Sequence, residues 1–148
     1  MTRASMPVVY IAGPYRGRTR AAVELNIQSA RALGLLAARK GWSPIIPHAN
    51  TGHLDLVAPD LQDSFWLEAT MELMRRADAV LLCPGWENSE GTQAEVAEAA
   101  RTGIPVIHSL HALPCADDWR QLEQIEIQAQ PVGRAHGKEC SATPAREA

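Results

Sequence analysis

Short apolar runs alternate along this chain with longer segments whose apolar residues recur every three or four positions. The short runs have the length and composition of buried strands, and they lie at 7–12, 43–46, 79–83 and 104–107. The longer segments have the period of amphipathic helices, and they lie at 19–40, 63–76, 91–101 and 117–128. This alternation predicts an α/β domain. We expect a Rossmann-like parallel sheet of four to five strands with helices on both faces.

Local residue choices place the boundaries of these elements. Pro44 indicates either an early position within the second strand or a strand at the edge of the sheet. Residues 49–62 contain Gly, Pro and Asp and are expected to form a loop, as are residues 84–90. Asp63 or Ser64 is expected to cap the helix that follows the first of these loops.

Length and composition indicate one globular domain. The chain has 148 residues, of which 46% are hydrophobic and 21% charged, values that exclude wholesale disorder. From residue 131 onward the sequence is rich in Pro, Gly, Ala and charge and has no apolar period. We therefore expect a domain at 1–130 and a flexible C-terminal tail at 131–148.

Charge and cysteine content narrow the possible partners. The formal net charge is −3, whereas a nucleic-acid binder needs a basic surface. No apolar run approaches the roughly 20 residues of a membrane helix, and the N-terminus lacks the pattern of a signal peptide. Three cysteines, Cys83, Cys115 and Cys140, show no metal-ligand spacing. We expect a cytoplasmic protein with no metal, no cofactor, no nucleic-acid partner and no membrane contact.

Residues at the carboxyl ends of the predicted strands are the candidates for ligand binding, because parallel sheets bind ligands there. Gly13, Tyr15 and Arg16 follow the first strand, and His48 follows the second. Gly13 allows a ligand to approach the backbone closely, and the guanidinium of Arg16 suits a phosphate. There is neither a GxGxxG fingerprint nor a Walker A sequence.

The segment after the third strand carries the most chemical information. Ser89 and Gly91 lie where the loop enters a helix, so free N–H groups and the helix dipole favour an anion there. Glu95 follows one turn later on a helix face that is otherwise free of charge. Trp86, on the preceding loop, either stacks on a base or sugar or covers the end of the sheet.

Four motifs taken together resemble the nucleoside 2-deoxyribosyltransferase superfamily. They are Tyr10-Ile-Ala-Gly-Pro-Tyr-Arg16, Pro47-His48, Ala77-Asp-Ala-Val-Leu-Leu82 and Ser89-x-Gly91-x-x-x-Glu95. The sequence looks most like the 2′-deoxynucleoside 5′-monophosphate N-glycosidases and related nucleotide N-ribosidases. The stretch Pro84-Gly-Trp-Glu-Asn-Ser89 also resembles a largely bacterial and phage branch of the superfamily. The similarity covers residues 7–110.

This resemblance implies roles for individual residues. Glu95 matches the nucleophile that attacks the anomeric carbon of the sugar, and Tyr10 matches a tyrosine beside it. The residues that match the 5′-phosphate site are Gly13, Arg16, Ser89 and Gly91. The residues that match the base pocket are Tyr15 and His48. Trp86 and Asn88, from the same motif region, complete the expected substrate-binding set.

The acid that would protonate the departing base is harder to place. The position at which the family has its second aspartate is occupied here by Thr70. Asp63 lies seven residues earlier, two turns away on a similar helix face, and is our candidate for this role. If neither residue acts as the acid, the chain binds nucleotides without rapid hydrolysis.

The resemblance thus implies a hydrolase that cleaves the N-glycosidic bond of a (deoxy)nucleoside 5′-monophosphate to free base and sugar 5′-phosphate. It also implies a homodimer or higher oligomer, with the helix of Trp119 as a candidate contact. Three alternatives remain: a deoxyribosyltransferase, a non-catalytic nucleotide-binding module, and a cytokinin-type phosphoribohydrolase. The phosphoribohydrolases have a PGGxGTxxE motif, which Pro84-Gly85 and Gly91-Thr-x-x-Glu95 loosely resemble. Here five residues, 86–90, separate the two parts of the motif, where the family has two.

Overall fold

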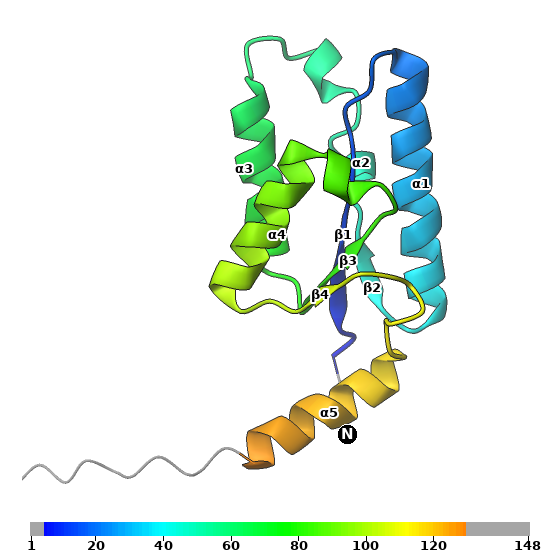
Figure 1. Cartoon of the computed structure of the whole chain (residues 1–148), viewed down its shortest axis with the longest axis vertical. Helices are drawn as coiled ribbons and strands as arrows, with labels where there is room; N and C mark the ends of the chain where they lie inside the picture. Colours follow the sequence, from blue (N-terminus) through cyan, green and yellow to red (C-terminus); the bar gives the residue numbers. More distant parts are fainter. Residues whose placement is uncertain (1–4, 130–148) are drawn as a thin grey trace, which may run out of the picture.

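Four parallel strands form the sheet at the centre of the structure (Figure 1). The computed structural model describes residues 5–129, so the tail expected at 131–148 lies outside the described residues. The strands are β1 (Val8–Ala12), β2 (Ser43–Ile45), β3 (Ala79–Leu82) and β4 (Val106–Ile107), in the order β2-β1-β3-β4. The α/β prediction is confirmed, and β2 with its Pro44 is an edge strand, one of the two expected alternatives.

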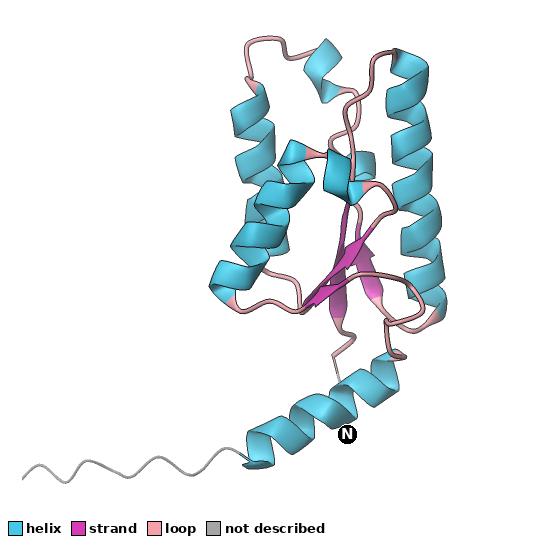
Figure 2. Cartoon of the chain, in the orientation of Figure 1, coloured by secondary structure: helices cyan, strands magenta, loops and turns pink. Residues whose placement is uncertain are grey.

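Helices lie on both faces of this sheet (Figure 2). The helices are α1 (Arg20–Arg39), α2 (Pro47–Asn50), α3 (Asp63–Met74), α4 (Glu90–Thr102) and α5 (Ala116–Ala129). Two short 3₁₀ turns, η1 (Leu54–Leu56) and η2 (Trp86–Asn88), precede α3 and α4. In the part of the chain that the structure describes, no helix has the length and apolarity required to cross a membrane.

Alternation along β1 divides the core into two clusters. Val9 and Ile11 contribute to the cluster that contains residues of α1, whereas Tyr10 and Ala12 contribute to the cluster that contains residues of α3 and α4. All four side chains are fully buried. Successive residues of a strand point to opposite faces, so a strand covered on both sides becomes a continuous apolar run.

Side-chain caps explain where two of the helices begin. Thr19 accepts a hydrogen bond from the backbone N–H of Ala22 at 3.1 Å at the start of α1, and Ser89 accepts one from Thr92 at 3.2 Å at the start of α4. The end of α4 is set by Gly103, whose φ of 75° is left-handed. The strand ends and the cap at Ser89 together place the start of α4 beside the carboxyl end of β3.

Three local predictions were wrong. The stretch 49–62 contains the end of α2 and the turn η1, and α2 is initiated by Pro47, whose missing N–H and fixed φ suit the first turn of a helix. The N-cap of α3 is Gln62, which makes no capping hydrogen bond, and Asp63 is already helical. Similarly, η2 forms within the predicted loop at 84–90.

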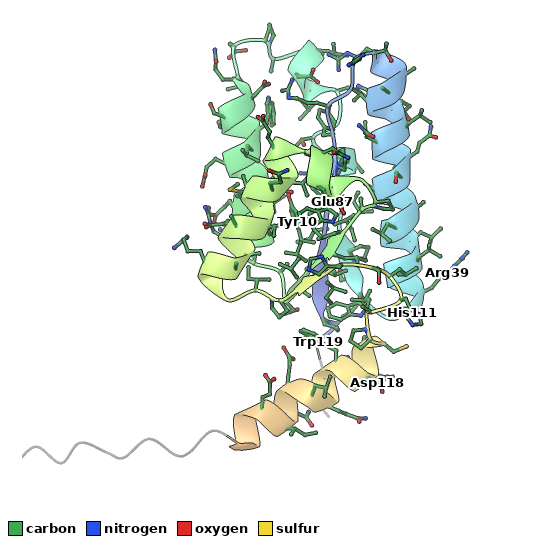
Figure 3. All side chains as sticks on the ribbon, viewed as in Figure 1. Tyr10, Arg39, Glu87, His111, Asp118 and Trp119 are labelled. Carbon is green, nitrogen blue, oxygen red and sulfur yellow. The ribbon has the colours of Figure 1, made fainter. Side chains whose placement is uncertain are left out.

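Helix α5 extends from one end of the domain (Figure 1). Its first turn is anchored by Trp119, whose ring packs on that of Trp42 with the centroids 5.1 Å apart. The indole N–H of Trp42 donates to the carbonyl of Pro114 at 2.8 Å. Figure 3 shows Trp119 at the end of α5 nearest the domain.

Candidate active site

A cavity of about 620 Å³ opens at the carboxyl ends of the strands. Its walls come from the loop after β1, the short helix α2, one face of α3 and the first turns of α4. Nine of the eleven site residues expected from the sequence line it: Gly13, Tyr15, Arg16, His48, Asp63, Asn88, Ser89, Gly91 and Glu95. These residues are spread over more than 80 positions of sequence, and the parallel topology brings them together.

Glu95 and Tyr10 form a buried hydrogen-bonded pair at this cavity. The Tyr10 hydroxyl donates to Oε1 of Glu95 at 2.6 Å. Only 7% of Glu95 is exposed, and Tyr10 is fully buried within the domain (Figure 3). Tyr10 is not itself a lining residue. It holds the carboxylate from behind, which matches its expected place beside the nucleophile.

Burial controls the ionisation of this pair. Loss of solvation raises the pKa of Glu95 to about 7, and the hydrogen bond from Tyr10 offsets part of that rise because it stabilises the carboxylate. The pKa of Tyr10 is raised above its ordinary value, first by burial and then by the neighbouring charge of Glu95. Glu95 therefore titrates near neutral pH while Tyr10 remains a hydroxyl donor. A carboxyl group of this kind in a cavity is typical of catalytic sites.

Gly13 is required by the close approach of β1 and β3 below the cavity. A Cβ atom at this position would lie 2.5 Å from Cβ and 2.7 Å from Sγ of Cys83. Burial, followed by the charge of Glu95, raises the pKa of Cys83 to about 12. The thiol is therefore protonated at neutral pH and is a packing residue.

The first turn of α4 provides hydrogen-bond donors to the cavity. Ser89 Oγ accepts from both the backbone N–H and the hydroxyl of Thr92, at 3.2 and 2.9 Å, so the hydroxyl proton of Ser89 is left for a ligand. Glu90 and Gly91 line the same wall, and their N–H groups lie in the turn where a helix has no internal acceptor. These donors suit an anion.

Arg16 lies at the exposed rim of the cavity in an ion pair with Asp63. About two-thirds of each side chain is exposed. Asp63 was expected to be the general acid, but the structure pairs its carboxylate with the Arg16 guanidinium at the rim. A ligand phosphate would compete with Asp63 for that guanidinium.

His48 and Tyr15 hold the loop after β1. Nε2 of His48 lies 2.9 Å from the carbonyl oxygen of Gly13 and 3.1 Å from that of Pro14, so Nε2 carries the proton and donates. Burial lowers the pKa of His48, which keeps the ring neutral. The Tyr15 hydroxyl donates to Asp55 at 3.3 Å and accepts from the N–H of His53 at 2.9 Å. Both residues therefore shape the wall of the predicted base pocket.

The two tryptophans near the site lie in different environments. Trp86, for which stacking on a ligand and covering the sheet were both expected, does not line the cavity; it packs on the cluster beneath α3 and α4 and against His108, with ring centroids 5.9 Å apart. Trp66, which was not among the expected site residues, is half-buried and lines the cavity. Its helix α3 also presents Asp63, Leu67 and Thr70 to the cavity. These four residues have the three- and four-residue spacing of one helix face. The same spacing in the sequence identifies the face of α3 that lines the cavity, once the position of the cavity is known.

Thr70 is the lining residue beside the hydroxyl of Tyr10. Its own hydroxyl donates to the carbonyl of Leu67 at 3.0 Å. Among residues 5–129, no three His, Cys, Asp or Glu side chains are grouped as the ligands of a metal ion. The chemistry at this cavity therefore has to be argued from Glu95, Tyr10 and the hydrogen-bond donors of α4.

The fold and the cavity define an α/β protein with a cavity at the carboxyl edge of a parallel sheet. A family model described as "Domain of unknown function (DUF7768)" matches residues 7–109, and the chain belongs to this family. The match spans all four strands and every lining residue of the cavity. A search of curated proteins found no match.

Proposed function

We propose that this protein hydrolyses the N-glycosidic bond of a (deoxy)nucleoside 5′-monophosphate, with Glu95 as the nucleophile. The observation that carries the proposal is the buried pair of Tyr10 and Glu95 at the cavity. The resemblance of the sequence to the nucleoside 2-deoxyribosyltransferase superfamily supports the same assignment, because Glu95 matches the nucleophile of that superfamily.

The chemistry follows from the charge that develops on the sugar. Breaking the bond to the base gives the anomeric carbon oxocarbenium character, and a carboxylate either stabilises this charge or adds to the carbon. Glu95 is held in one orientation by Tyr10 at 2.6 Å and titrates near neutral pH. In the proposed reaction it forms a glycosyl ester, which water then hydrolyses to sugar 5′-phosphate.

The donors at the start of α4 and the Arg16 guanidinium support a phosphorylated substrate. Ser89 retains a free hydroxyl proton, and the amides of Glu90 and Gly91 are unused by the helix. A phosphate placed there would be four to six residues from Glu95, about 6–9 Å along the axis. That separation suits a 5′-phosphate and an anomeric carbon on the same ribose.

The test is release of free base, measured by chromatography, from a panel of ribo- and deoxyribonucleoside 5′-monophosphates with neutral and cationic bases. Glu95→Gln should lower turnover by at least a hundredfold, because an amide cannot act as the nucleophile. The matched control is Glu98→Gln, which should retain activity. Glu98 lies about one turn further along α4 and forms ion pairs with Arg75 and Arg101. Equal turnover by Glu95→Gln and the parent would overturn the mechanism.

The same panel separates the alternatives. Transfer of the sugar to an added second base would indicate a deoxyribosyltransferase, and a preference for N6-substituted adenine ribotides would indicate a phosphoribohydrolase. Calorimetric binding of monophosphates with no base release from any of them would indicate a nucleotide-binding module. Thr70, where the superfamily has an aspartate, is the observation that favours this last alternative.

A further inference from the structure

A neutral base needs a proton as it leaves the sugar, so an N-glycosidase for ordinary nucleotides places an acid near the scissile bond. The lining residue next to the Tyr10–Glu95 pair is Thr70. Its hydroxyl is not an acid at neutral pH, and its proton is already donated to the carbonyl of Leu67. Thr70 therefore supplies no proton to a leaving base.

Three further titratable groups of the cavity wall are engaged elsewhere. Asp55 accepts from the Arg20 guanidinium at 2.7 Å, and this bond lowers the pKa of Asp55. Asp63 is paired with Arg16 at the rim. His48 uses its Nε2 proton on two backbone carbonyls, and burial lowers its pKa. Asp55 and His48 are therefore held in forms that do not donate a proton to a ligand, and the Asp63 carboxylate is engaged by a guanidinium.

The wall also carries an excess of negative charge. Asp55, Asp63, Glu90 and Glu95 line the cavity. Asp55 is paired with Arg20 and Asp63 with Arg16, so the charge without an ion-pair partner among the described residues is that of Glu90 and Glu95. The cavity therefore favours a ligand group with a positive charge.

We propose, as an extension of the proposed function, that the substrates are nucleotides whose base is already a cation. The class comprises N-glycosides of a quaternised ring nitrogen, such as a pyridinium or an N-alkylated purine. The 5′-phosphate takes the donors of α4, and the cationic ring faces the carboxyl group of Glu95.

Such a substrate removes the need for an acid. When the bond between the anomeric carbon and the cationic nitrogen breaks, its electron pair stays on nitrogen and neutralises the ring, so the base leaves without a proton. The Glu95 carboxylate forms the new bond to the anomeric carbon. Water then displaces Glu95 as a carboxylate, and the proton of that water passes to solvent.

The first test compares two nucleotides that differ by one methyl group and one charge. Guanosine 5′-monophosphate and 7-methylguanosine 5′-monophosphate are incubated with the full-length protein, together with the corresponding 2′-deoxy pair, and spontaneous loss of base is subtracted. We expect the methylated, cationic nucleotide to be cleaved at least a thousandfold faster in kcat/KM. Nicotinamide mononucleotide, a pyridinium nucleotide, is a second cationic probe.

The second test restores the acid. Thr70→Asp should raise cleavage of guanosine 5′-monophosphate or its deoxy form by tenfold or more, because a positioned acid contributes about 10²–10⁴ in rate. It should leave cleavage of the methylated nucleotide unchanged or slower. Thr70→Asn, of the same size but without a proton to give, is the matched control and should show no gain. Circular dichroism establishes that both variants are folded.

The outcomes separate this inference from the function on which it rests. Cleavage of the neutral and methylated nucleotides within tenfold of each other overturns the cationic substrate class and leaves the N-glycosidase proposal standing. A folded Thr70→Asp that gains nothing on the neutral nucleotide also overturns the inference. If neither the parent nor Thr70→Asp releases base from any probe, the proposed function itself is wrong.

Discussion

Glu95 is unusual because it is a buried carboxyl group, and its anion would be better stabilised in water than in the protein interior. Its pKa is about 7 in the folded protein, against an ordinary value of 4.5. The folded state thus holds the proton more tightly than the unfolded state does. Stability is unaffected by this group below about pH 4.5, falls as the pH rises toward 7, and is lower by about 3 kcal/mol above that.

Glu95→Gln should therefore stabilise the protein in a pH-dependent way. Relative to the parent, its free energy of unfolding should gain about 3 kcal/mol between pH 4 and pH 8, since the amide never ionises. Urea unfolding at pH 4, 6 and 8 measures this difference, and any pH-independent cost of burying the amide cancels. A difference that does not grow with pH would show that Glu95 is not buried as described.

The control variant Glu98→Gln should show a change in stability with pH of the opposite sign. Hydrogen bonds from Arg101 and Arg75 lower the pKa of Glu98 to about 2. Its contribution to stability is present above the unfolded pKa of about 4.5 and is lost as the pH falls toward 2. Glu98→Gln should therefore lower stability at pH 8 and change it little near pH 2.

At the scale of elements, the ion pair of Arg16 and Asp63 connects the loop after β1 to the start of α3. If Asp63 occupies the guanidinium that a phosphate needs, Asp63→Asn should lower the KM for monophosphates severalfold and leave kcat nearly unchanged. Arg16→Ala should raise the same KM and leave the KM for unphosphorylated nucleosides unaffected. Steady-state kinetics on both substrate types measure these effects.

The kinetics also decide between two roles for Asp63. A general acid would lose kcat by a hundredfold or more on conversion to asparagine, whatever its effect on KM. That result would restore the role expected from the sequence and would remove the argument for a cationic base.

Periodicity was sufficient to predict the main elements, because the apolar runs of the strands and the three- to four-residue spacing of the helices are local. The cap of α3 and the short helix α2 were missed since neither depends on periodicity: α2 follows from Pro47 and from burial of His48. Trp66 was missed as a lining residue, and the two alternatives for Trp86 were left open, for a related reason. Which of two tryptophans faces a cavity depends on packing against distant residues such as His108, and local sequence does not record it.

At the scale of the whole molecule, α5 offers the surface for the homodimer that the sequence resemblance implies. Leu122 and Ile125 lie three residues apart on this helix and are 54% and 61% exposed. Joint replacement by glutamate should convert the assembly to monomers, because a charge buried at an interface without a partner is costly. Light scattering after size exclusion measures the mass.

The control for this prediction is Val57→Glu. Val57 is 77% exposed on the segment between η1 and α3. Its substitution therefore changes an exposed apolar residue that lies away from α5. The variant should leave the mass unchanged. A parent protein that is already monomeric, or a dimer indifferent to the α5 changes, would contradict the prediction.

Both lateral edges of the sheet are poor templates for a further strand. Strand β2 carries Pro44, which has no N–H to donate, and β4 has only two residues. Exposed edges of long strands are where unrelated chains join by backbone pairing and begin to aggregate. This sheet gives an incoming strand almost nothing to pair with. Copies that meet through helices therefore remain discrete assemblies, and the protein should tolerate high concentration without forming fibrils.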